Sequence, residues 1–195
     1  MNTAPDNAEP DEALMTRLRS GDEAALAALM ARWERPIKRY LARVVQNTAE
    51  AEELAQETFV RVYQQRARFR AGARFSPWLY AIAANLARNR LRWWRRRPAV
   101  SLDAWTELGH ETADEHAAGQ TGAKPLEQRE RAEAVRAAVA ALPVELREAL
   151  VLCEYERLSQ AEAAEALGVT VKAIETRLYR ARARLREQLQ RWWQS

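Results

Sequence analysis

Apolar residues recur at three- and four-residue spacing along most of the chain, and no segment alternates apolar and polar residues as a half-buried strand would. The pattern predicts an all-α protein. Residues 1–10 are polar and expected to be disordered, and a short helix is predicted over about 11–19. Asp22 can cap a second helix, and Asn47 and Thr48 begin a third helix that runs to about Arg66.

Proline and glycine mark the breaks between these helices. Pro36 is expected to kink or restart the second helix, because proline lacks the N–H group that a helix interior needs. Gly72 lies in a predicted loop over 67–75. Ser76 and Pro77 then provide an N-cap and a helix-compatible first residue for a fourth helix, which ends near Arg95.

Residues 98–127 have the composition of a flexible linker, with three glycines, two prolines, and six acidic residues against one basic residue. A connection of about 30 residues is longer than an ordinary interhelix loop, so the segment indicates two domains, over 11–97 and 128–191. Helices are expected to resume at about Leu126 and to break at Leu142 and Pro143. A further helix is predicted over about 144–156.

The most specific local pattern covers residues 159–189. Ser159 and Glu162 fit a capping box, Gly168 stands where a left-handed helix end needs glycine, and Thr170 can cap the next helix. A short helix, a glycine turn and a longer basic helix are typical of a helix-turn-helix motif.

The longer helix has two expected sides. Its apolar side consists of Val171, Ile174, Leu178, Leu185 and Leu189. Its other side carries residue types that hydrogen-bond base edges and phosphates in a major groove, namely Lys172, Glu175, Thr176, Arg177, Tyr179, Arg180 and Arg184. The alternative is an amphipathic surface helix with a solvated basic face.

Charge is distributed unevenly along the chain. The net charge is +4, yet residues 61–97 contain eleven arginines and no carboxylate. Such a stretch favours a polyanionic partner. Aromatic side chains that could stack unpaired bases are interleaved with the arginines, namely Phe69, Phe75, Trp78, Tyr80, Trp93 and Trp94. The alternative is that Trp78 is core and that the arginines form a solvated helix end.

The third helix has an acidic face that suits a basic protein partner. Glu53, Gln56 and Glu57 lie within one helical turn. A solvated acidic face is the alternative.

Composition excludes several classes. Cys153 is the only cysteine, so no disulfide or cysteine zinc site forms within the chain, and His110 and His116 have poor metal-site spacing. No run approaches the ~20 apolar residues of a membrane span, and the acidic N-terminus is unlike a secretory signal. We therefore expect a cytoplasmic protein without a cofactor and without an enzyme active site.

The order of these motifs resembles that of the extracytoplasmic-function (ECF) sigma factors of the sigma-70 family, over residues 11–97 and 125–190. AEELAQETFVRVY (51–63) resembles region 2.2, which binds the β′ clamp helices of RNA polymerase. RFSPWLYAIAANLARNRL (74–91) resembles regions 2.3–2.4, which open and read the −10 promoter element. Residues 142–187 resemble region 4, which reads the −35 element.

The resemblance implies roles for particular residues. Glu53, Gln56 and Glu57 match polymerase-binding positions. The loop over 69–75 matches one that captures a flipped base, although it lacks the acidic residue common in the family. The positions implied in −10 binding are Phe69, Arg70, Arg74, Phe75, Asn85, Arg88, Asn89 and Arg92, and those implied in −35 binding are Lys172, Thr176, Arg177, Tyr179, Arg180 and Arg184.

The implied partners are core RNA polymerase, through its β′ clamp helices and β flap, promoter DNA, and a membrane-bound anti-sigma factor. Two other interpretations stay open. One is a stand-alone helix-turn-helix regulator whose residues 11–97 sense a signal or dimerise; the other is an adaptor whose basic stretch binds an acidic partner. The sequence leaves open whether the free protein is extended or compact, and what Trp192 and Trp193 contact.

Overall fold

The computed structural model of the protein describes residues 9–70, 72–96 and 126–190. Every element in these ranges is a helix, which confirms the predicted all-α fold class. The predictions for residues 1–8, for most of the linker, and for Trp192 and Trp193 lie outside the described residues. None of the described helices is long and apolar enough to cross a membrane.

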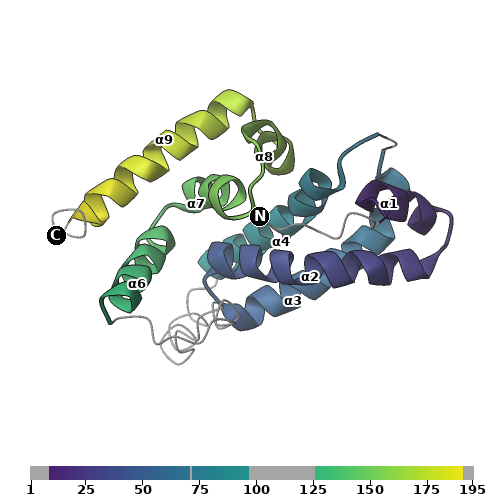
Figure 1. The fold of residues 1–195 in the computed structure, drawn as a ribbon, viewed down its shortest axis with the longest axis horizontal. Coiled ribbons are helices and arrows are strands. Elements are labelled where there is room, and N and C mark those ends of the chain that lie inside the picture. Colours follow the sequence, from purple (N-terminus) through teal and green to yellow (C-terminus); the bar gives the residue numbers. More distant parts are fainter. Residues whose placement is uncertain (1–8, 71, 97–125, 191–195) are drawn as a thin grey trace.

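The N-terminal helices are arranged around α2, which packs against α1, α3 and α4 (Figure 1). Their bounds are Asp11–Arg19 for α1, Glu23–Val45 for α2, Thr48–Gln65 for α3 and Phe75–Arg96 for α4, with a 3-10 turn η1 at Arg66–Arg68. The apolar positions of these helices face one another and form the core of this half.

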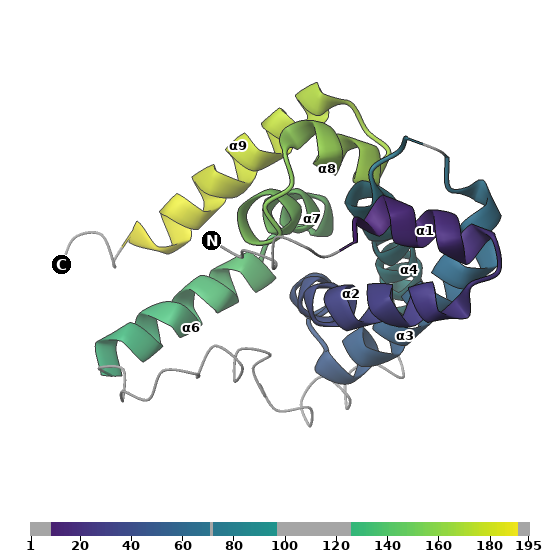
Figure 2. The same cartoon turned by 45° about the vertical axis from the view of Figure 1, so that its right-hand side comes forward.

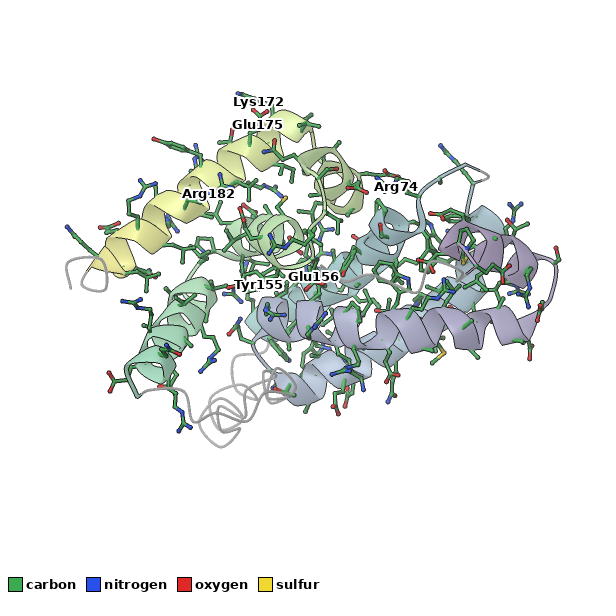
Figure 3. All side chains as sticks on the ribbon, in the orientation of Figure 1. Arg74, Tyr155, Glu156, Lys172, Glu175 and Arg182 are labelled. Atoms are coloured by element: carbon green, nitrogen blue, oxygen red, sulfur yellow. The ribbon has the colours of Figure 1, made fainter. Side chains whose placement is uncertain are left out.

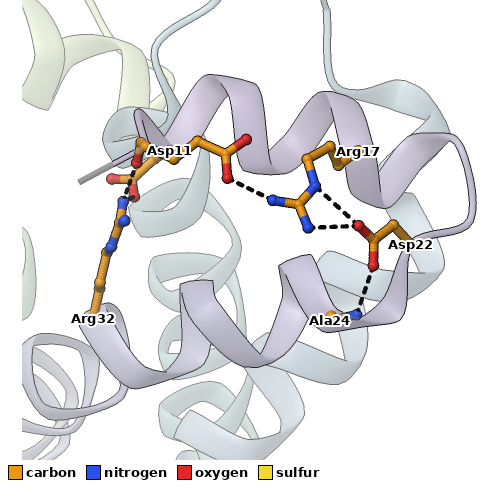
Figure 4. A network of polar contacts seen from close by, with 6 residues as sticks. Asp11, Arg17, Asp22, Ala24 and Arg32 are labelled. Atoms are coloured by element: carbon orange, nitrogen blue, oxygen red, sulfur yellow. Dashed lines mark hydrogen bonds and ion pairs between the residues drawn. The ribbon is translucent and has the colours of Figure 1, made fainter. Parts of the chain in front are cut away.

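Polar caps set where these helices begin. The Asp22 carboxylate accepts a hydrogen bond from Ala24 N–H, and the Asn47 side chain accepts one from Glu50 N–H, each at 3.0 Å. Both predicted starts are confirmed. Arg17 donates two further hydrogen bonds to Asp22, which tie the end of α1 to the start of α2 (Figure 4).

Helix α2 passes through Pro36 without interruption, so the prediction of a restart there is wrong. A proline inside a helix removes one backbone hydrogen bond and costs about 3 kcal/mol. Leu29 before it and Ile37 and Tyr40 after it are all fully buried. Burial of large apolar side chains contributes roughly 1.5–3 kcal/mol each, which is enough to hold the helix together.

Helix α4 begins at Phe75, before the predicted N-cap Ser76. The Glu12 carboxylate of α1 accepts a hydrogen bond from Phe75 N–H at 2.9 Å. A side chain from another helix thus satisfies a backbone donor at this helix start. Such a cap leaves no local pattern in the sequence.

The C-terminal helices contain the predicted helix-turn-helix. Ser159 and Glu162 form the capping box, Gly168 is left-handed with φ of 65°, and Thr170 caps the next helix. The bounds are Leu126–Ala140 for α6, Val144–Leu150 for α7, Gln160–Leu167 for α8 and Val171–Gln188 for α9.

The helix predicted over 144–156 is α-helical only in its first half. After α7, residues Val151–Tyr155 make a π-helical turn, η4, and Arg157 is left-handed with φ of 63°. The wider turn is closed by a hydrogen bond from Glu156 N–H to the Val151 carbonyl at 3.0 Å. It directs Tyr155 and Glu156 toward the N-terminal helices, as Figure 3 shows for Glu156.

The two groups of helices are packed together. Helix α8 lies against α4, and α7 and η4 lie against α2 (Figures 1 and 2). Buried apolar residues from both groups belong to one continuous core. The described parts of the two predicted domains therefore share an interface.

Candidate nucleic-acid interface

Helix α9 presents its predicted polar side to solvent. Lys172, Thr176, Arg180 and Arg184 are exposed, and Tyr179, at 76%, has the highest exposure among the exposed large hydrophobic residues of the described ranges. Figure 3 shows Lys172 on the outer side of α9, away from the other helices. This surface combines cationic groups, a hydroxyl and an aromatic ring, which suits a major groove.

Two local contacts order this surface. Lys172 pairs with Glu175 at 2.9 Å, and the Thr176 hydroxyl donates to the Lys172 carbonyl at 2.9 Å. Glu175 therefore offsets the charge of Lys172 at the start of the helix. Arg177 is only half-buried and lies close enough to the buried Glu148 to influence its charge state.

The apolar side of α9 is narrower than predicted. Ile174 and Leu178 are buried, whereas Val171 is 42% exposed, so the prediction that Val171 faces inward is wrong. Val171 is the first residue of α9, and its neighbour Thr170 caps the N-terminus of the helix. Ala181 is fully buried instead, because its position on the helix faces the same core as Ile174.

Helix α4 carries two asparagine–arginine pairs along its length. Arg88 donates to the Asn85 side chain at 3.1 Å, and Arg92 donates to the side chain of Asn89. Asn85, Asn89 and Arg92 are exposed and Arg88 is half-buried. In each pair, the hydrogen bond holds the guanidinium group beside the side-chain amide. Both groups carry donors that can bind base edges or phosphates.

The loop before α4 has buried aromatics and exposed arginines. Phe69 and Phe75 are core residues, and the Phe69 ring lies 5.2 Å from that of Trp78 in an edge-on arrangement. Arg70 and Arg74 are exposed. The two phenylalanines, predicted at the −10 site, anchor the loop in this structure and present no face to solvent, while the arginines are accessible.

The acidic face of α3 is exposed as expected. Glu53 and Gln56 are exposed, and Glu57 pairs with Arg61 at 2.7 Å. Val60 lies on the same face and is 46% exposed, although it was not among the residues predicted for this face. Its spacing of three and four residues from Glu57 and Gln56 was the available signal.

The described residues contain no cluster of histidine, cysteine or acidic side chains that could hold a metal ion. Cys153 is half-buried and forms no disulfide, and burial raises the pKa of its thiol. A raised pKa keeps the thiol protonated and weakly nucleophilic.

Comparison with known proteins identifies both halves. The family model for sigma-70 region 2 matches residues 29–97, and the model for sigma-70 region 4 matches residues 132–185. The RNA polymerase sigma-H factor of Pseudomonas aeruginosa is 33% identical over 189 residues, which cover 93% of this chain and 95% of that protein. The chain belongs to the sigma-70 family.

Within the family, this sigma factor is similar to ECF members. The ECF sigma factor SigW of Bacillus subtilis is 32% identical, over 89% of this chain and 93% of SigW, and CarQ of Myxococcus xanthus is 36% identical, over 90% and 95%. The solved structure of CnrH in complex with the cytosolic domain of CnrY is similar, with a TM-score of 0.68 at 25% identity, covering 93% and 98% of the chains.

These findings show an alternative sigma factor for transcription initiation, as the motif order indicated. The regulator and adaptor interpretations receive no support from them. Region 2 contains the acidic face of α3 and the basic helix α4, and region 4 contains α8 and the exposed surface of α9.

Proposed function

We propose that this sigma factor brings core RNA polymerase to its promoters through three separate surfaces. The acidic face of α3 binds polymerase, α4 and its loop bind the −10 element, and α9 reads the −35 element. The observation that carries the proposal is the exposed polar surface of α9, displayed by a capped helix-turn-helix within a sigma-70 region 4 match.

On α9, we infer that Thr176, Tyr179 and Arg180 face base edges, together with Lys172. These side chains are exposed and lie around one side of the helix. Arg177 and Arg184 lie toward one edge of that side, where phosphates run in a major-groove complex. Each well-made bidentate contact discriminates by roughly 1–3 kcal/mol.

On α4, the exposed Asn85, Asn89 and Arg92 would contact the non-template strand once it is open. Arg88 joins them when its present partners release it, and Arg70 and Arg74 hold the strand at the loop. Phe69 and Phe75 act from the core by fixing the shape of the loop. Capture of an unstacked base recovers about 1–3 kcal/mol, comparable with the cost of unstacking it, so strand capture can drive melting.

On α3, Glu53, Gln56 and Glu57 would bind the basic β′ clamp helices, and Val60 adds an apolar contact on the same face. An apolar contact beside charged and polar groups is a common arrangement for a protein interface. Region 4 would bind the β flap of the polymerase.

We further infer that the protein acts in the cytoplasm, where it meets core polymerase, and that it performs no chemistry of its own. An anti-sigma partner, expected to be membrane-bound, is supported by the structures in which CnrH is bound to the cytosolic domain of CnrY and RpoE of Bartonella quintana to the anti-sigma factor NepR. The second of these is 23% identical to this chain and has a TM-score of 0.65.

The test is co-elution of the purified protein with bacterial core RNA polymerase on a sizing column, followed by selection of promoter fragments by the complex. We expect a one-to-one complex that retains a common pair of −35 and −10 sequences. Failure to co-elute, together with tight binding of duplex DNA by the protein alone, would contradict the proposal.

A further inference from the structure

The loop over 69–75 presents exposed arginines between two buried aromatic residues. Phe69 is 3% exposed and Phe75 is 0% exposed, and their rings lie 6.3 Å apart. Between these two residues, Arg70 and Arg74 are exposed. The positions of the two arginines therefore depend on what holds the buried ends of the loop.

One end of the loop is held by α1. The Glu12 carboxylate, in the first turn of this helix, accepts the hydrogen bond from Phe75 N–H through Oε1 at 2.9 Å. Phe75 begins α4 and is fully buried, so water does not readily replace this acceptor. A buried donor without a partner costs enough free energy to shift a conformational equilibrium about fivefold or more. Glu12 thus fixes the point where the loop ends and α4 begins.

A second acidic residue of α1 acts on the same phenylalanine through a tryptophan. The Asp11 carboxylate accepts a hydrogen bond from Trp33 Nε1 at 2.9 Å, and it pairs with Arg32 at 2.8 Å (Figure 4). The Trp33 ring lies 5.9 Å from that of Phe75 in an edge-on arrangement. The first turn of α1 therefore holds the backbone of Phe75 directly and its ring by way of Trp33.

Helix α1 is itself fixed to the other helices of the N-terminal half. Leu14, Met15 and Leu18 are each at most 2% exposed, and α1 packs against α2, η1 and α4 (Figures 1 and 2). The burial of these three side chains keeps α1 in place when one exposed side chain of its first turn is changed. Helix α1 also precedes residues 29–97, so these contacts come from a part of the chain outside the region 2 match.

Charge alone does not explain a carboxylate beside this basic stretch. Residues 61–97 contain eleven arginines and no acidic residue, and Glu12 brings a carboxylate to them from α1. A carboxylate repels a phosphate backbone, so by charge alone its removal would strengthen DNA binding. The hydrogen bond to Phe75 acts in the opposite sense, because its loss frees the end of the loop. The two effects therefore predict changes of opposite sign.

We propose that Glu12 is a positioning residue for promoter opening, whose carboxylate holds Phe75 and the loop over 69–75 in the shape that captures the opened −10 strand. Glu12 acts without contacting DNA. The proposal rests on the proposed role of the loop and α4 in −10 binding. Arg70 and Arg74 then meet the strand in a preformed arrangement, which lowers the cost of binding.

The test compares holoenzymes that carry variants of the full-length protein. The probe is a labelled promoter fragment selected by the parent holoenzyme, with its −10 region held open by mismatched bases. Fluorescence anisotropy measures affinity for this fragment and for an upstream duplex that ends before the −10 element. Glu12→Ala removes the carboxylate, whereas Glu12→Gln removes the charge and keeps a carbonyl oxygen that can accept from Phe75 N–H.

We expect Glu12→Ala to bind the opened fragment about fivefold more weakly than the parent, and to open the fully paired promoter about fivefold more slowly. Affinity for the upstream duplex should not change, because α9 does not depend on the loop. Glu12→Gln should bind the opened fragment within about twofold of the parent, since the acceptor is retained.

Asp22→Ala is the matched control. It also removes a carboxylate that accepts from an N–H group at a helix start, that of Ala24 at 3.0 Å, but beyond the other end of α1. Urea unfolding measures the stability that it loses, and circular dichroism measures helicity. It should bind the opened fragment like the parent. A loss of affinity equal to that of Glu12→Ala would show that stability rather than loop position matters, and would overturn the proposal.

Two results with the Glu12 variants would also overturn it. If Glu12→Ala binds the opened fragment as tightly as the parent or more tightly, the strand senses only the charge of the carboxylate. If Glu12→Gln loses as much affinity as Glu12→Ala, the hydrogen-bond acceptor does not carry the effect.

Asn89→Ala with Arg92→Ala separates these results from failure of the proposed function. Both residues are exposed on α4, and their loss should weaken binding of the opened fragment. If this double variant binds like the parent, the −10 role of α4 is wrong. If it binds weakly while Glu12→Ala binds like the parent, α4 binds the strand and Glu12 does not position the loop.

Discussion

The arginines of this sigma factor have two kinds of environment, and the difference decides what each can do. Arg147 is buried and donates to the carbonyl of Val44 near the end of α2 and to that of Leu142 in the turn between α6 and α7. Arg180 is exposed on the DNA-facing side of α9. The guanidinium group of Arg147 thus stabilises the interface between the two halves, whereas that of Arg180 remains accessible to DNA.

The exposed side chains of α9 support a prediction for −35 recognition. Thr176→Ala with Arg180→Ala should weaken binding of the holoenzyme to a −35-dependent promoter by about 30-fold or more, since two base contacts worth roughly 1–3 kcal/mol each sum to at least about 2 kcal/mol. Core polymerase should still bind normally. Promoter affinity and co-elution are measured in parallel, with Arg186→Ala as the exposed control on the same helix. An equal loss of polymerase binding would contradict the assignment of surfaces.

The acidic face of α3 supports the complementary prediction. Glu53→Arg with Gln56→Ala should lower affinity for core polymerase by at least about tenfold, because it places a cation against a basic partner. Titration of labelled protein with core polymerase measures the effect. Glu133→Arg on α6 makes a comparable charge change outside this face and should have little influence. Parent-like affinity in the double variant would rule out this docking face.

Helix ends set the geometry of the elements in this protein. The capping box of α8 and the left-handed Gly168 fix the turn of the helix-turn-helix, and both are local in the sequence. The start of α4 depends instead on Glu12 of α1, and the residue after the π-helical η4, Glu156, accepts a hydrogen bond from Tyr80 of α4. Local caps are therefore readable from sequence, whereas caps supplied across the fold are not.

Gly168 gives a prediction at this scale. No atom lies within 4 Å of a Cβ added at this position, so a substitution is limited only by the φ of 65°. Gly168→Ala should cost about 1 kcal/mol in the free energy of unfolding, and Gly168→Asn should cost less, because asparagine tolerates the left-handed region better. Urea unfolding measures both. Equal stability of all three proteins would show that the turn relaxes in solution.

At the scale of the whole molecule, the buried carboxylates of the interface make stability depend on pH. Burial raises the pKa of Glu148 from 4.5 to about 7, an effect that Arg88 and Arg177 oppose and Glu145 reinforces. Burial also raises the pKa of Glu156. Between about pH 4.5 and pH 7, the folded protein therefore binds more protons than the unfolded chain.

The expected result is a loss of stability as pH rises from about 5 to about 7.5, amounting to roughly 3 kcal/mol for Glu148 at 1.36 kcal/mol per pH unit. Urea unfolding at a series of pH values measures the slope. Glu148→Gln should flatten it, since an amide does not titrate. Below pH 4.5 the lowered pKa values of Asp22 and Glu162 act in the opposite sense, so stability should fall again on acidification. A slope that is the same in Glu148→Gln would contradict the assignment.

Local patterns in the amino-acid sequence define the helices and most of their ends. Helical spacing of apolar residues, Asp22, Asn47, the Ser159–Glu162 capping box and Gly168 act within a few residues, so a local pattern contains them. The order of the motifs determined the family. Exposure of Glu53, Gln56 and the DNA-facing side of α9 followed from the same periodicity.

Features that depend on contacts between residues distant in the sequence became visible only in the folded protein. It put Phe69 and Phe75 in the core, kept α2 intact through Pro36, and brought α8 onto α4. Arg88 and Glu148 are 60 positions apart in the sequence, and each has an ordinary local environment on its own helix. Their pairing arises from packing of the two halves, which depends on free energies of burial summed over both surfaces and leaves no periodic signal in either one.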